Sequence, residues 1–160
     1  MVYDTLDRVI MTVANYVVQG SSQPANWIWS TTNNRWENGA GTAISFGTDN
    51  DQNRITTLTY DLLGRVLQMR DAAGIETRYT VDLLGRRTQI VASYVNGVFN
   101  SAFPDEDLIS ATVFNKMGQV TSTTDVRGTQ TTFTYDKLYR RLTLTRAAGT
   151  ALSSLTYTCY

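Results

Sequence analysis

The sequence predicts an all-β fold, built as an antiparallel meander of short hairpins. Composition is the first observation behind this prediction, because lysine occurs only at positions 116 and 137 and glutamate only at positions 37, 76 and 106. Helix-favouring charged residues are therefore scarce, whereas Thr, Tyr, Val and Ile, which suit a pleated and half-buried surface, are abundant. A turn motif that recurs at fixed spacing is the second observation.

The recurring motif is Asp-x-x-Gly, in which the Asp side chain bonds the backbone two residues on and the Gly accepts a positive φ. Complete or degenerate copies begin at residues 61, 71, 82, 115, 125, 136 and 146, so steps of ten and eleven alternate within a 21-residue unit. The stretches between turns are strand-length, about 20 Å. Strands joined by such short turns run antiparallel, because a parallel crossover needs a dozen or more residues. We therefore expect the strand order to follow the chain.

Every second turn follows an aromatic or large apolar residue and, except where Gln119 stands, ends in Arg. The residues that carry this pattern are Tyr60, Asp61, Gly64 and Arg65; Asp82, Gly85 and Arg86 after Val81; Tyr135, Asp136 and Arg140; and a degenerate copy from Tyr3 to Arg8. We expect the rings to stack in a row along one edge of the sheet, and the Asp and Arg side chains to form ion pairs that fix the register of successive hairpins. Tyr139 stands where Gly belongs and tolerates a positive φ poorly, so a different turn type is predicted at 136–140.

These segments resemble the Tyr-Asp (YD) repeats of Rhs proteins, a family whose relatives include the B and C components of bacterial insecticidal toxin complexes and the teneurin ectodomains. The resemblance covers residues 55–160 and one degenerate copy at 3–8, and it is carried by Tyr60-Asp-Leu-Leu-Gly-Arg-Val66, Asp82-Leu-Leu-Gly-Arg86 and Phe133-Thr-Tyr-Asp136. It implies a β-ribbon that spirals into a hollow shell around a toxic C-terminal domain, or a cell-surface scaffold. The self-cleaving end of such shells carries Asp-Pro motifs, which are absent here because Pro24 follows Gln and Pro104 follows Phe.

Two insertions interrupt the repeats and divide the chain. We assign degenerate repeats to 1–19, a Trp-rich insertion hairpin to 20–54, repeats to 55–95, an acidic loop insertion to 96–108 and further repeats to 109–160. Both ends cut through a repeat, so we expect the chain to be a fragment of a larger protein.

The first insertion contains all three tryptophans, Trp27, Trp29 and Trp36. Alternation places Trp27 and Trp29 on one face of a strand, with Trp36 on the returning strand. One interpretation is an aromatic platform that binds a sugar or peptide. The other, which we favour, is that three large rings close a hairpin and plug the shell.

Acidic residues in the insertions invite metal or acid–base interpretations. The run Asp49-Asn-Asp51-Gln-Asn53 mimics half of a calcium loop, but Arg54 and Tyr60 stand where an EF-hand needs Gly and Glu, so a polar turn is predicted. The second insertion opens with Asn96-Gly97, which predicts a hairpin between Tyr94-Val95 and Val98-Phe99. Its run Asp105-Glu106-Asp107 alternates in direction on an extended chain, so a solvated acidic loop without chemistry is predicted.

Composition excludes several classes of function. No His is encoded, so nucleophile–His pairs and His-ligated metal sites are excluded, and the single Cys159 forms no internal disulfide. A net charge of zero gives no footprint for a nucleic acid, and no apolar run approaches the ~20 residues that span a bilayer.

We therefore expect a structural segment of a shell or surface scaffold, without enzymatic activity, cofactor or metal. A carbohydrate- or receptor-binding module on the cell surface is the alternative. The expected partners are the remaining YD repeats of the parent chain, a toxin cargo domain and, for the alternative, a cell-surface glycan. The expected location is secreted or cell-surface, although no secretory signal is visible in the sequence.

Overall fold

The computed structural model describes residues 1–18, 23–44 and 51–158. Two compact units divide the chain, residues 1–77 and 78–160, and each is described by itself. Cys159 and the first two residues of the calcium-loop mimic, Asp49 and Asn50, lie outside the described residues.

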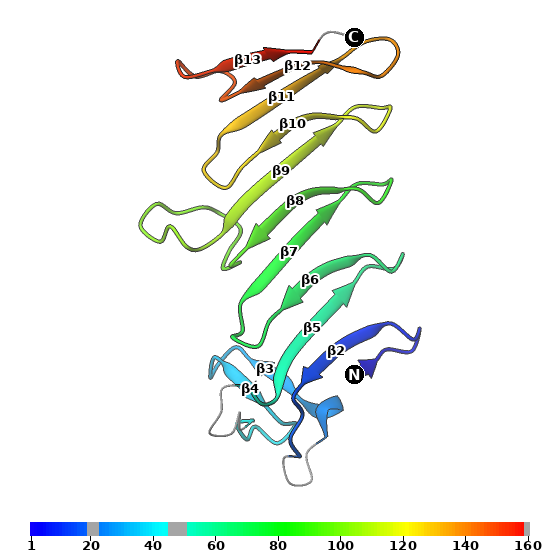
Figure 1. Cartoon of the computed structure of the whole chain (residues 1–160). Helices are drawn as coiled ribbons and strands as arrows, with labels where there is room; N and C mark the ends of the chain where they lie inside the picture. Colours follow the sequence, from blue (N-terminus) through cyan, green and yellow to red (C-terminus); the bar gives the residue numbers. More distant parts are fainter. Residues whose placement is uncertain (19–22, 45–50, 159–160) are drawn as a thin grey trace. The chain divides into compact units, whose positions relative to one another are not determined.

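The first unit is an antiparallel meander from which one hairpin departs. Its sheet has the order β1 (Val2–Tyr3), β2 (Val9–Ala14), β5 (Arg54–Tyr60) and β6 (Val66–Arg70). Between β2 and β5 the chain forms the short 3-10 helix η1 (Pro24–Asn26) and a separate two-stranded sheet of β3 (Ile28–Ser30) and β4 (Arg35–Glu37) (Figure 1).

The second unit is a meander in which each strand pairs with the next. The strands are β7, which spans Glu76–Val81 and begins at the end of the first unit, β8 (Arg87–Ala92), β9 (Leu108–Phe114), β10 (Val120–Thr124), β11 (Gln130–Tyr135), β12 (Arg141–Arg146) and β13 (Ser154–Tyr157). All pairings are antiparallel. The turns between β7 and β8, β9 and β10, and β11 and β12 share one edge, while the second insertion and the β10–β11 turn lie on the other (Figure 1). The predicted all-β fold and the chain-ordered antiparallel meander are thus confirmed.

Buried apolar side chains gather in the first unit. Met11 of β2 and Ile55 of β5 form one cluster with Trp27, Trp36 and Ile44 of the first insertion. Within the described part of the second unit, Val91 is the buried apolar residue, and most strand residues there are half-buried. A single sheet buries its strands mainly against its neighbours in the repeat, as expected for a solenoid-like array.

A β-bulge follows every turn that an aromatic or large apolar residue precedes. In the second unit Phe114 pairs with Val120 but Val113 pairs with Ser122, so β10 carries one extra residue. No such shift occurs across the β10–β11 turn. Because side chains alternate between faces, an odd unit of 21 residues would otherwise put successive rings on opposite faces. The bulge therefore keeps Phe114 and Tyr135 on the same face of the sheet.

Candidate functional site

The turns preceded by an aromatic or large apolar residue, which we call ring turns, share one hydrogen-bonding pattern. The ring turns are residues 4–8, 61–65, 82–86, 115–119 and 136–140. In the second of them the Asp61 N–H donates to the Arg65 carbonyl at 2.9 Å, and Asp61 Oδ1 accepts from the N–H groups of Leu63 and Arg65, both at 2.9 Å. Gly64 then takes a φ of 79°. One carboxylate oxygen therefore accepts hydrogen bonds from two backbone N–H groups of the turn.

The turn at 136–140 has this same pattern, so the prediction of a different turn type is wrong. Its Asp136 N–H donates to the Arg140 carbonyl at 2.9 Å, and Asp136 Oδ1 accepts from Leu138 and Arg140. Tyr139 adopts the glycine conformation with a φ of 65°. The hydrogen bonds of the turn thus outweigh the conformational strain of a bulky residue, which is of order 1 kcal/mol.

Each ring turn that has both Asp and Arg closes on itself through an ion pair. Arg8 Nε donates to Asp4 Oδ2 at 2.7 Å, and Arg86 Nε donates to Asp82 Oδ2 at 2.6 Å. The other pairs are Asp61–Arg65 at 2.5 Å and Asp136–Arg140 at 2.7 Å. In the turn at 115–119, Asn115 and Gln119 replace the charges and keep an amide-to-amide hydrogen bond of 2.8 Å.

The same side chains also connect one ring turn to the next. Arg8 Nη1 donates to the Asp61 carbonyl at 3.0 Å, and Arg86 Nη1 donates to the Asn115 carbonyl at 3.4 Å. Gln119 Nε2 continues the series by donating to the Tyr139 carbonyl at 3.0 Å. The acceptor is the backbone in every case, so these links depend on the spacing of the turns and not on the identity of the residue that accepts.

The rings of the ring turns lie against the preceding turn. The Tyr60 hydroxyl donates to the Val9 carbonyl, and the Tyr135 hydroxyl donates to the Val120 carbonyl, both at 2.7 Å. The Arg8 guanidinium lies 4.8 Å from the centre of the Tyr60 ring, and that of Arg86 lies 4.4 Å from the Phe114 ring. Within each unit, a guanidinium group of one ring turn therefore lies against the ring that precedes the next ring turn, by cation–π attraction.

The carboxylates of the ring turns are held in their ionised form. At Asp4 and Asp82 the hydrogen bond from the Arg side chain is the largest cause of a lowered pKa. At Asp61 and Asp136 the largest cause is the backbone N–H of the Arg that ends the turn, which lowers the pKa in the same direction. Desolvation opposes the shift of the pKa at all four positions. A charge that already bonds its own turn is poorly placed for acid–base chemistry.

The tryptophans of the first insertion pack mainly as a core. Trp27 and Trp36 are each 2% exposed, and the Trp29 ring meets the Trp36 ring edge-on with 5.4 Å between centroids. Trp29 itself is half-buried, and the Arg70 guanidinium lies 5.2 Å from its ring centre. Trp27 precedes β3 and does not lie within a strand that it shares with Trp29. These three residues therefore do not form an open platform of rings on which a flat ligand would stack.

Trp29 also attaches the inserted hairpin to a turn of the sheet. Gly74, in the turn after β6, leaves room for the ring: a Cβ on Gly74 would stand 2.0 Å from Trp29 Cη2. Arg70, which contacts the same ring, donates from Nη1 to the Gly74 carbonyl at 2.8 Å and forms an ion pair with the buried Glu76. The insertion is thus fixed to the repeat because the Trp29 ring packs against Gly74, where no Cβ blocks it, and against the Arg70 guanidinium.

A buried polar residue closes the first insertion where the chain returns to the sheet. Asn53 is fully buried with a φ of 51°, and its N–H donates to the Asn15 carbonyl at 3.0 Å. Its Oδ1 accepts from the Val17 N–H at 2.8 Å. The run at 49–53 predicts a polar turn that includes Asn53, and nothing in that run indicates this buried role.

Asp107 closes the second insertion in the same way. It is 1% exposed, its φ is 47°, and its N–H donates to the Ser93 carbonyl at 2.9 Å. Its carboxylate accepts from the N–H groups of Val95, Asn96 and Gly97 at 2.8–3.3 Å. Burial alone would raise the pKa of Asp107, but these backbone donors outweigh it and lower the pKa.

Two predictions for the second insertion are therefore wrong. Asn96-Gly97 forms no hairpin, because the N–H groups at 95–97 converge on the Asp107 carboxylate in place of a partner strand. The acidic run is not uniformly solvated, since Asp105 is exposed while Asp107 is buried. The two insertions share one sequence signal for this closure. A Tyr-Val pair follows the strand before each insertion, Tyr16-Val17 after β2 and Tyr94-Val95 after β8, and Asn53 or Asp107 directly precedes the strand that follows it.

The second insertion also borders a cavity of about 610 Å³. Phe99, Pro104, Leu108, Ile109 and Val126 supply most of its wall, and Asp125 and Arg127 of the β10–β11 turn complete it. The lining of the cavity is mainly apolar, and Asp125 and Arg127 are its charged residues. Nowhere in residues 1–18, 23–44 and 51–158 do three His, Cys, Asp or Glu side chains gather as metal ligands would. A search of those same residues finds no helix of the length and apolarity needed to cross a membrane.

Comparison with known proteins finds one family-model match and several similar solved structures. Residues 114–151 match the family model described as RHS Repeat. No curated protein sequence matches the chain. Among solved structures, the crystal structure of TcdB2-TccC3-TEV aligns with a TM-score of 0.55 at 16% identity over 91% of this chain, and that of TcdB2-TccC3 with a TM-score of 0.53 at 15% identity over 90%.

Each of these alignments covers 6% of the solved chain, so the present chain spans a small part of the proteins it resembles. At such identities the likeness establishes the fold, while the family-model match establishes the repeat type for residues 114–151. The chain thus contains an RHS repeat at residues 114–151 and shares its fold with the TcdB2-TccC3 structures.

Proposed function

We propose that this chain is a structural segment of an Rhs-type shell or surface scaffold, which acts outside the producing cell as part of a longer protein and encloses or presents a toxin domain. The linkage between successive ring turns carries the proposal. Arg8, Arg86 and Gln119 each donate to a backbone carbonyl of the next ring turn, so the array continues for as long as the repeat does. A repeat of this kind forms a wall with no need for a reactive centre.

The proposal assigns no catalysis to this segment. The carboxylates of the ring turns are engaged by their own backbone and by Arg, so these carboxylates are poorly placed to exchange a proton with a substrate. The solved relatives support the encapsulating role only as an analogy of fold, since their chains are far longer.

The alternative, a glycan-binding module, draws little support from the tryptophans. Trp27 and Trp36 are buried, so only Trp29 offers ring surface to a ligand. A titration of Trp fluorescence with oligosaccharides tests it, and a saturable change in the intact chain that Trp29→Ala abolishes would restore this alternative.

Limited proteolysis of the longer protein that carries this segment tests the shell role. We expect its C-terminal domain to resist protease in the native protein and to be digested once the wall is opened by urea. Equal digestion of that domain in the native and the urea-treated protein would contradict encapsulation. A matched control is the isolated C-terminal domain, whose cleavage rate reports its own resistance.

A further inference from the structure

The ring turns of the second unit present large apolar side chains to solvent at equivalent positions. The residue before the glycine position is Leu84, Met117 and Leu138 in the three turns, and these side chains are 73%, 66% and 70% exposed. Isolated exposed apolar residues are ordinary, whereas contiguous apolar patches rimmed by polar residues mark interaction sites. We call these three residues the apolar column.

A second column runs beside the first. The residue directly after the Asp or Asn of each turn is Leu83, Lys116 and Lys137, all exposed, with Leu83 at 99%. Both lysines lack an ion-pair partner among the residues that the structure describes. The three turns have the same backbone geometry, so this second column lies beside the apolar column. Two of its three positions, Lys116 and Lys137, are cationic.

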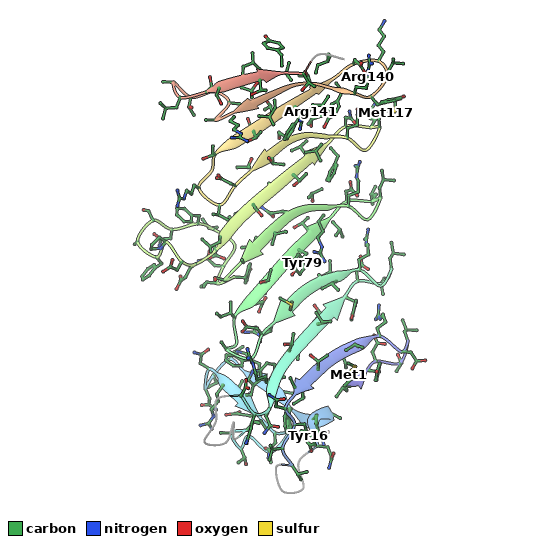
Figure 2. The ribbon with its side chains drawn as sticks, in the orientation of Figure 1. Met1, Tyr16, Tyr79, Met117, Arg140 and Arg141 are labelled. Carbon is green, nitrogen blue, oxygen red and sulfur yellow. The ribbon has the colours of Figure 1, made fainter. Side chains whose placement is uncertain are left out.

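The three turns are held side by side, so the columns are continuous. Arg86 bonds the carbonyl of Asn115, Gln119 bonds the carbonyl of Tyr139, and the Tyr139 hydroxyl lies 3.9 Å from the sulfur of Met117. Figure 2 shows Met117 at the tip of its turn, next to the turn that carries Arg140. Neighbouring ring turns are two strands apart, which corresponds to about 9.6 Å.

We propose that this edge of the sheet is a docking site for an amphipathic α-helix whose apolar stripe is bordered by carboxylates. Seven residues of helix advance about 10.5 Å, close to the separation of two ring turns, so apolar residues at heptad spacing meet Leu84, Met117 and Leu138 in succession. A helix of about 15 residues spans the three turns. Glutamates beside its apolar stripe then face Lys116 and Lys137, which supplies the charge complementarity that selects such a partner.

Charge also argues against a second copy of the same edge as the occupant. Two copies would bring Lys116 and Lys137 of one molecule against the lysines of the other, with no acidic side chain of this edge free to compensate, because Asp82 and Asp136 pair with Arg in their own turns. Like charges in an interface disfavour the pairing. The inference does not rest on the shell role, because it concerns only the exposed face of three turns.

Binding of two synthetic helical peptides to the whole chain tests the proposal. The peptides are about 20 residues long and share leucines at heptad positions a and d, and they differ only in having Glu or Lys beside that stripe. Fluorescence anisotropy should show the Glu peptide binding roughly tenfold or more tightly than the Lys peptide. The double variant Lys116→Glu with Lys137→Glu should reverse this preference.

Removal of the apolar column is the second arm. The triple variant Leu84→Ser, Met117→Ser and Leu138→Ser should lose binding of both peptides, while Val126→Ser in the β10–β11 turn on the other edge should leave binding unchanged. These side chains are exposed, and urea unfolding of each variant verifies that the fold is intact. Equal affinity for the two peptides, binding that survives the triple variant, or self-association of the wild-type chain that the triple variant abolishes would each overturn the proposal.

Discussion

The hydroxyl of Tyr60 donates a hydrogen bond of 2.7 Å to the carbonyl of Val9, which lies 51 residues earlier in the chain. Tyr135 repeats this relationship with the carbonyl of Val120 at the same distance. The tyrosine of the repeat is therefore a connector between one ring turn and its predecessor, in addition to a ring that contributes buried area. Val81 and Phe114 occupy the same position without a hydroxyl, so the connection is made only where Tyr is present.

Removal of this hydroxyl should weaken the fold by a modest and specific amount. Tyr60→Phe should lower the free energy of unfolding by about 1 kcal/mol, the usual contribution of one hydrogen bond. Urea unfolding followed by circular dichroism measures the change. Tyr157→Phe, at a ring that is largely exposed, is the control and should unfold like the wild type. If Tyr60→Phe leaves the free energy of unfolding unchanged, the hydrogen bond to Val9 contributes nothing to stability.

Two glycines of equivalent turns separate backbone strain from contact with the insertion. Gly74 and Gly128 have φ values of 83° and 78°, but only at Gly74 would a Cβ meet the Trp29 ring. Gly128→Ala should cost roughly 1 kcal/mol from the backbone alone, whereas Gly74→Ala should cost roughly 2–4 kcal/mol because the ring is displaced as well. Urea unfolding measures both, and Trp fluorescence should change only in Gly74→Ala. Equal costs would mean that Trp29 does not pack on this turn.

Tyr139 is the clearest site for stabilisation. Its φ of 65° is the conformation that glycine adopts at this position of the other ring turns, so Tyr139→Gly should raise the free energy of unfolding by roughly 1 kcal/mol. Tyr139→Ala removes the ring but keeps a Cβ in the strained conformation, and it should give little of this gain. Thermal unfolding of the two variants decides the matter. A gain that Ala matches would assign the effect to the ring and not to the backbone.

Stability should fall in acid because the turn carboxylates are bound in their ionised form. The pKa values of Asp4, Asp61, Asp82, Asp136 and Asp107 are lowered in the folded chain. Below the ordinary pKa of Asp, about 3.9, the unfolded chain takes up protons that the folded chain resists. The contribution of these carboxylates to the free energy of unfolding is therefore complete above that pH. It is lost as the pH falls through their lowered pKa values in the folded chain.

Urea midpoints at pH 7, 5 and 3 measure this dependence, with little change expected between pH 7 and 5 and a clear loss at pH 3, below the ordinary pKa of Asp. Asp82→Asn keeps the Oδ1 acceptor, as Asn115 does naturally in the next ring turn, and it should flatten the pH dependence while retaining the turn. A midpoint that does not change with pH would show that the ionised carboxylates do not stabilise the fold.

The periodic part of the fold was accessible from the sequence, and the insertions were not. Asp61, Gly64 and Arg65 form a local pattern whose turn chemistry is settled within five residues, so spacing alone predicts the strand order. Asn53 and Asp107 close the two insertions through hydrogen bonds from Val17 and Val95, which lie 36 and 12 positions away in the chain. No local sequence rule specifies contacts at such separations. A buried Asp that binds three backbone N–H groups looks in sequence like any solvated acid.

Tyr139 shows a different limit of sequence reasoning. Residue preference alone predicts another turn type at 136–140, yet the hydrogen bonds of Asp136 and the packing of neighbouring strands impose the common geometry. The bulge after each ring turn was equally hidden, although the odd length of the 21-residue unit requires one. The backbone preference of a single residue is therefore a weak constraint where the hydrogen bonds and strand pairings of the repeat determine the turn.

The most direct test of the wall-forming role is an electron cryomicroscopy structure of the longer protein that contains this segment. The account predicts that strands β5 to β13 lie in chain order within a continuous wall around an internal cavity, with ring turns joined through their backbone carbonyls. A segment folded apart from the other repeats, or strands paired out of chain order, would contradict it.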